Sequence, residues 1–64
     1  MRYAGLTDEP KRIKQEHGNP RNFGIIQQFR TEAEAKLWVS RMLARGYEKD
    51  TMGKGWKYGY TFSS

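Results

Sequence analysis

The residues best suited to chemistry near the start of the chain are Tyr3, Arg12 and His17. A tyrosine, an arginine and a histidine in this order could form a catalytic site. His17 could act as a general base or contact a phosphate group. The alternative is that a lone histidine at a helix end interacts with the helix dipole and packs its ring.

A strand over residues 3–7 and a helix over residues 9–17 would position these side chains. Thr7 or Asp8 could cap the start of the helix, and a proline at position 10 suits a first turn. The helix is expected to close at Gly18.

Ile13 is the only large aliphatic residue of this helix. We expect its side chain to point at the core. Residues four apart share a helix face, so Ile13 would draw His17 inward with it.

The residue pattern over positions 23–29 predicts a second strand. Its one side would carry Phe23, Ile25, Gln27 and Phe29. Thr31 and Glu34 then form a capping box for a helix that ends before Gly46. One face of that helix is apolar and is expected to pack on the sheet. The apolar residues are Ala35, Trp38, Val39, Met42 and Leu43.

Residues 47–62 predict a hairpin that turns at residues 53–55. The alternation of aromatic residues in its second half places them on one sheet face. These residues are Trp56, Tyr58, Tyr60 and Phe62. They could form part of the core, or a stacking platform for unpaired bases that is flanked by Lys54 and Lys57.

The predicted order is therefore β-α-β-α-β-β, an α+β fold with a small four-stranded sheet and both helices on one face. The expected core comprises Leu6, Ile13, Ile25 or Ile26, Trp38, Val39, Met42 and part of the aromatic row. We expect one domain spanning residues 1–64.

The chain has 64 residues, no cysteine and a net charge of +5. The absence of cysteine excludes disulfides and cysteine-based zinc sites, and one histidine cannot build a histidine-rich metal site. No signal peptide or membrane span is visible, so we expect a cytoplasmic protein. The positive charge favours nucleic acid as a partner.

The opening stretch, Tyr3-Ala4-Gly5 with Thr7, Pro10 and His17, resembles the second half of the GIY-YIG endonuclease motif. The segment TEAEA after Phe29 resembles the later family segment that leads into an acidic-starting helix. The resemblance covers roughly residues 2–43. It implies metal-assisted phosphodiester hydrolysis, in which tyrosines help to position the nucleophile, an arginine stabilises phosphate charge and a glutamate holds a divalent cation.

The resemblance implies Tyr3, Arg12 and His17 as catalytic residues, and a divalent metal as cofactor, only if the chain is a nuclease. Ile13 stands where the family usually has its arginine, and Val39 lies close to the position of the glutamate. We therefore expect no acidic ligand to face the tyrosines and no metal site.

The first strand of the motif is also missing before Tyr3. The C-terminal strand could take its place beside Tyr3, as in a circular permutation. Tyr58 and Tyr60 would then bring hydroxyls near Tyr3.

The leading hypothesis is a non-catalytic nucleic-acid-binding module on a GIY-YIG-like scaffold. Its expected contacts are Lys11, Arg12, Lys14, Arg21, Lys57 and Tyr58, with Tyr3 as a possible stacking or phosphate-bonding group. One alternative is a weakly active metal-dependent endonuclease. Another is a protein-interaction adaptor or inhibitor of the phage or mobile-element type. The sequence leaves the oligomeric state open.

Overall fold

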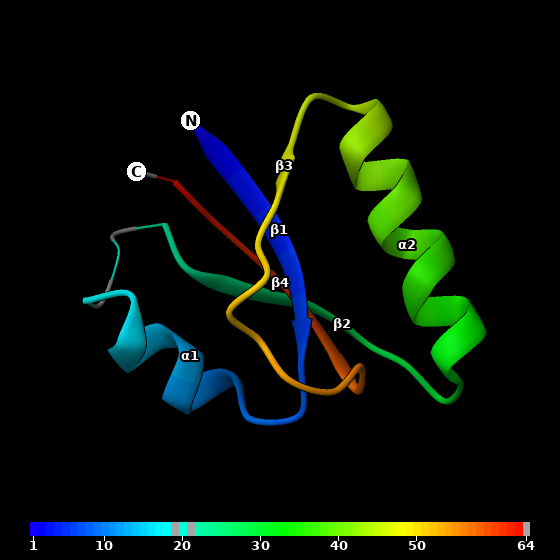
Figure 1. The fold of residues 1–64 in the computed structure, drawn as a ribbon, viewed down its shortest axis with the longest axis horizontal. Helices are drawn as coiled ribbons and strands as arrows, with labels where there is room; N and C mark the ends of the chain where they lie inside the picture. Colours follow the sequence, from blue (N-terminus) through cyan, green and yellow to red (C-terminus); the bar gives the residue numbers. More distant parts are fainter. Residues whose placement is uncertain (19, 21, 64) are drawn as a thin grey trace.

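The computed structural model describes residues 1–18, 20 and 22–63, and it confirms the predicted α+β class and element order. Figure 1 shows the two helices on either side of the strands. The elements follow one another as β1 (Arg2–Thr7), α1 (Pro10–Glu16), β2 (Gly24–Gln28), α2 (Glu32–Ala44), β3 (Glu48–Lys49) and β4 (Tyr58–Ser63).

The four strands form one mixed sheet in the order β2-β4-β1-β3. β4 runs antiparallel to β1 and β2, and β3 runs parallel to β1. The prediction that the C-terminal strand lies beside Tyr3 is confirmed, because Tyr3 is paired with Phe62.

The predicted hairpin over residues 47–62 is wrong, because β1 lies between β3 and β4. The segment after β3 follows β1 instead of turning back on itself. The Asp50 N–H donates to the Ala4 carbonyl at 2.9 Å, and the Asp8 N–H donates to the Lys54 carbonyl at 2.8 Å. Gly53 permits this close approach, since a Cβ there would lie 2.1 Å from the Leu6 carbonyl oxygen.

The helices cover opposite faces of the sheet, so the expectation of both on one face is wrong. Successive residues of a strand point to opposite faces. Tyr60 and Phe62 of β4 pack with Ile13 of α1. Gly59 lies between them in the strand and faces the other way, where a Cβ would lie 2.8 Å from the Trp38 ring of α2.

The pairing of β2 is irregular, and the aromatic residues directly before and after this strand therefore lie on opposite faces of the sheet. Its pairing with β4 shifts between Ile25 and Gln27. Such a bulge inserts an extra residue and reverses the alternation beyond it. Phe23 therefore stacks on Tyr60. Phe29 instead packs against Trp38 on the α2 face, with the two ring centroids 5.6 Å apart. The prediction that Phe23 and Phe29 share one side is wrong for this reason.

α2 confirms most of its predicted pattern. The Thr31 hydroxyl accepts a hydrogen bond from the Glu34 N–H at 3.2 Å, and Gly46 follows the C-terminus with φ of 100°. Ala35, Val39 and Met42 are buried, while Leu43 remains 40% exposed.

The core consists mainly of the other residues that the sequence indicated, except on β2. Ile13, Tyr60 and Phe62 are buried. The expectation that Ile25 or Ile26 is buried is wrong, because β2 is an edge strand and their exposures are 53% and 54%.

α1 begins without the predicted side-chain cap. Glu9 occupies the N-cap position and makes no capping hydrogen bond. The buried Thr7 hydroxyl instead accepts from the Glu9 N–H at 3.0 Å, and Thr7 lies two residues before the N-cap position. The Asp8 carboxylate is directed at a different segment, the loop before β4.

Candidate functional site

The structure brings two of the three predicted catalytic residues together. The Tyr3 ring stacks on Phe62 with ring centroids 5.1 Å apart, and the His17 ring lies 4.3 Å from the same phenylalanine. Arg12 lies elsewhere, on the exposed side of α1. Its guanidinium pairs with Glu9 at 3.4 Å and with Glu16 at 3.2 Å. Hydrogen bonds to Glu9 and then Glu16 raise the pKa of Arg12.

A buried polar centre lies under α1 and consists of His17, Asp50 and Tyr60. One Asp50 oxygen, Oδ2, lies 2.9 Å from His17 Nε2 and also accepts a hydrogen bond from the Tyr60 hydroxyl. The side chains of His17 and Asp50 are 14% and 9% exposed, and Tyr60 is fully buried. The expectation that Ile13 draws His17 inward is therefore confirmed.

The pKa of Tyr60 is raised above its usual value of 10.0. Burial is the largest cause, because it penalises the charged phenolate. The hydrogen bond to Asp50 and the charge of that carboxylate act in the same direction, and a backbone hydrogen bond with Gly53 opposes them. Tyr60 is thus held as a neutral hydrogen-bond donor.

Asp50 overturns the expectation that no acidic group faces the tyrosines. The residue is 33 positions from His17 in the chain, and its place depends on the parallel pairing of β3 with β1. The only sequence signal is alternation along residues 48–50, which sends Glu48 and Asp50 to the face opposite Lys49.

The polar centre does not suit a divalent metal. His17 Nε2 and the Tyr60 hydroxyl, the two other groups that could bind a metal there, both contact the same oxygen of Asp50. In the described part of the chain, no group of three or more acidic or histidine side chains could hold a metal ion. The centre instead connects the C-terminal end of α1, through the contacts of Asp50, to β4 and to the segment after β3.

The exposed basic residues of α1 line two adjoining shallow grooves beside β2. The larger has a volume of about 560 Å³ and includes Lys11, Arg12 and Tyr58. The smaller has a volume of about 230 Å³ and includes Lys11, Lys14 and Phe23. Pro10 and Ile25 line both. We call these two depressions the α1–β2 groove.

The α1–β2 groove gathers four of the six predicted nucleic-acid contacts: Lys11, Arg12, Lys14 and Tyr58. Arg21 lies outside the described residues. Lys57 is exposed but does not line the groove.

Asp8 fixes the loop that precedes Tyr58. Its Oδ1 accepts hydrogen bonds from the Trp56 N–H at 3.1 Å and from the Lys57 N–H at 3.2 Å. The sequence suggested Asp8 only as a cap. Its role in positioning one wall of the groove depends on a contact 48 residues away.

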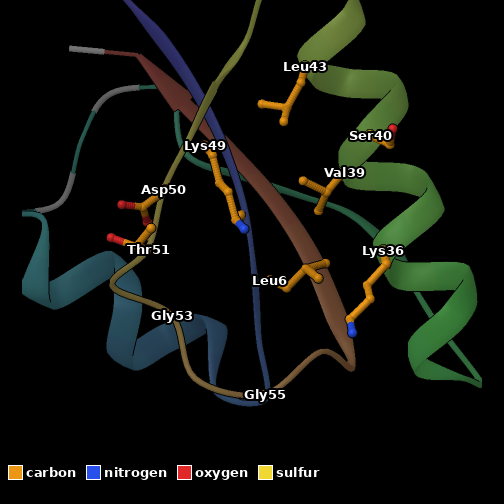
Figure 2. Close-up of a pocket in the computed structure, with 11 residues that line it drawn as sticks. Leu6, Lys36, Val39, Ser40, Leu43, Lys49, Asp50, Thr51, Gly53 and Gly55 are labelled. Atoms are coloured by element: carbon orange, nitrogen blue, oxygen red, sulfur yellow. The ribbon is translucent and has the colours of Figure 1, made fainter.

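A separate cleft of about 520 Å³ lies on the opposite face, between α2 and the segment after β3. Figure 2 shows the side chains that line it. They include Leu6, Lys36, Val39, Leu43, Lys49 and Gly53. Neither Lys36 nor Lys49 is among the residues that the sequence predicted for a site.

Together, these features define a small α+β domain with an aromatic-lined groove on one face and a lysine-flanked cleft on the other. The groove carries both charges, because Asp8 and Glu9 line it beside Lys11, Arg12 and Lys14. No family model, curated protein or solved structure matches the chain. Among the described residues, no helix is long and apolar enough to cross a membrane.

Proposed function

We propose that this protein is a non-catalytic nucleic-acid-binding module on a GIY-YIG-like scaffold, and that it binds through the α1–β2 groove. The observation that carries the proposal is the convergence of Lys11, Lys14 and Tyr58 on adjoining depressions. Cations beside an aromatic ring can contact phosphates and an unpaired base of the same strand.

Lys11 and Lys14 are the principal phosphate contacts in this proposal. Within the described residues, neither lysine forms an ion pair, and both are exposed. Arg12 contributes less, because Glu9 and Glu16 offset its charge. The net charge of +5 adds a long-range attraction for any polyanion.

The groove favours single strands over duplexes. Its apolar walls are Pro10, Phe23, Ile25 and Tyr58. A base in a single strand is available to pack on such walls, whereas a base in a duplex must first be unstacked.

The buried polar centre supports binding without hydrolysis. Tyr60 is fully buried, the His17 side chain is 14% exposed, and neither residue lines the α1–β2 groove, so neither is placed to exchange a proton with a phosphodiester there. Incubation of the protein with plasmid and Mg²⁺ or Mn²⁺ tests this part of the proposal. We expect intact plasmid. Cleavage that is lost in both Tyr3→Phe and Arg12→Ala would establish the endonuclease alternative.

Fluorescence anisotropy with a labelled single-stranded oligonucleotide tests the binding site. We compare the double variant Lys11→Gln/Lys14→Gln with Arg41→Gln/Arg45→Gln, which removes the same charge from exposed positions in the last turn and at the C-cap of α2. The proposal predicts that the first pair lowers the slope of log K against log salt by about 1 for each lysine. Equal losses in the two variants, or wild-type binding that is independent of salt, would refute it.

A further inference from the structure

The cleft between α2 and the segment after β3 owes its positive charge to strand alternation. Lys49 pairs with Ala4, so its side chain points to the α2 face of the sheet. Asp50 follows it and points to the α1 face, where its carboxylate binds His17 and Tyr60. The two carboxylates next to Lys49 in the chain, Glu48 and Asp50, thus both lie on the other side of the sheet.

A second lysine enters the cleft from the opposite wall. Figure 2 shows Leu6 between the side chains of Lys49 of β3 and Lys36 of α2, while Asp50 and Thr51 point away from α2. Lys36 pairs with Glu32 at 3.5 Å, but this pair is exposed on the helix surface. An exposed pair of this kind contributes little and is readily exchanged for another anion.

The floor of the cleft is apolar. It consists of Leu6, Val39 and Leu43, and Leu43 retains 40% exposure although it belongs to the packed face of α2. The volume of about 520 Å³ is within the range of small-molecule sites. Two lysine side chains on opposite sides of an apolar floor complement a ligand that has one anionic end and one apolar, flat body.

We infer that this cleft binds a small organic phosphate, namely a phosphate monoester attached to a flat apolar body, of which a mononucleotide is the simplest probe. A phosphate monoester carries between one and two negative charges at neutral pH, which matches two lysines. Lysine binds phosphate as a point charge without a fixed geometry. The site lies on the opposite sheet face from the α1–β2 groove and does not depend on nucleic-acid binding there.

The test is a titration of the ¹⁵N-labelled protein with adenosine 5′-monophosphate, followed by amide chemical shifts. Adenosine and ribose 5-phosphate serve as probes of the two halves of the ligand. We expect the monophosphate to shift amides of α2 and residues 49–55, and to bind at least about tenfold more tightly than either half.

Three variants assign the contacts. Lys49→Gln and Lys36→Gln should each weaken binding of the monophosphate by about tenfold. Leu43→Asn should weaken the monophosphate while leaving ribose 5-phosphate unchanged. Arg30→Gln is the charge-matched control and should have no effect, because Arg30 is exposed and lines neither the cleft nor the α1–β2 groove.

Two results would overturn the inference. One is an equal loss in Arg30→Gln and Lys49→Gln, which would mean that only net charge is sensed. The other is a set of shifted amides confined to α1 and β2, which would place the nucleotide in the α1–β2 groove. Neither result would decide whether a longer single strand binds that groove.

Discussion

The two faces of the sheet are stabilised in different ways. On the α2 face, a 13-residue helix with a side-chain cap packs on β1 and β4 and buries Ala35, Val39 and Met42. On the α1 face, a helix of seven residues has no side-chain cap and buries a single aliphatic residue, Ile13. Helices this short are not stable by themselves in water, so α1 depends on tertiary contacts.

The polar centre supplies those contacts. His17 follows the last turn of α1, and Asp50 links it to Tyr60 at the middle of the sheet. The helix that bears the proposed binding lysines, α1, is thus held in place by the buried Asp50 carboxylate. We expect disruption of that carboxylate to affect the α1 face most, and apolar changes to affect the α2 face.

The largest expected effect comes from Asp50→Ala. The change leaves the fully buried Tyr60 hydroxyl without its acceptor and His17 without its partner. We expect a loss of about 3 kcal/mol in the free energy of unfolding, measured by urea denaturation. Glu48→Ala removes the same charge from an exposed position of β3 and should change stability by less than about 0.5 kcal/mol. Similar losses in both variants would show that charge, and not the polar centre, matters.

Gly59→Ala tests the α2 face. Its new methyl group would lie 2.8 Å from the Trp38 ring, and the side chain must shift to accommodate it. We expect a loss of roughly 2 kcal/mol, since overpacking a core contact costs about this amount. Gly24→Ala on β2 is the control, because its Cβ would meet its nearest neighbour, Ile26, at an ordinary 3.9 Å. A tolerated Gly59→Ala would mean that α2 packs more loosely than described.

Alkaline pH separates the two faces in a different way. The raised pKa of Tyr60 means that the folded protein retains a proton that the unfolded chain loses above its usual pKa of 10.0. Stability is therefore fully present below pH 10 and falls as pH rises, by up to about 1.4 kcal/mol per pH unit from this group. In Tyr60→Phe, this part of the slope should disappear. An unchanged slope in the variant would contradict the assignment.

The smallest expected effects concern the helix starts. Thr31→Ala removes the cap of α2 and should cost about 1 kcal/mol. Glu9→Ser introduces a capping residue where α1 has none and should stabilise the protein by up to about 1 kcal/mol, less the loss of the exposed Arg12 pair. Thermal or urea unfolding measures both. A destabilising Glu9→Ser would indicate that the Arg12 pair outweighs a cap.

The sequence predicted the elements well because local signals determine them. The capping box at Thr31, the glycine at position 46 and the alternation in β4 each act within a few residues. The hairpin prediction failed because the pairing of residues 50–54 with β1 and the turn after it depends on long-range backbone hydrogen bonds.

The candidate sites were only partly predictable for the same reason. Lys11, Lys14 and Tyr58 could be proposed from charge and residue type. Asp50, by contrast, becomes recognisable only when β3 is placed beside β1. A one-residue irregularity in β2 decided which aromatic side chains face α1, and the sequence carries no clear mark of it.

We propose that nucleic acid binds the α1 face, on a helix that is held in place by a buried polar centre. Amide chemical-shift mapping with a short single-stranded oligonucleotide, at low and at high salt, tests it most directly. We expect shifts that are concentrated in α1, β2 and the start of β4 and that diminish as the salt concentration increases. Shifts centred on α2, or no shifts at low salt, would contradict it.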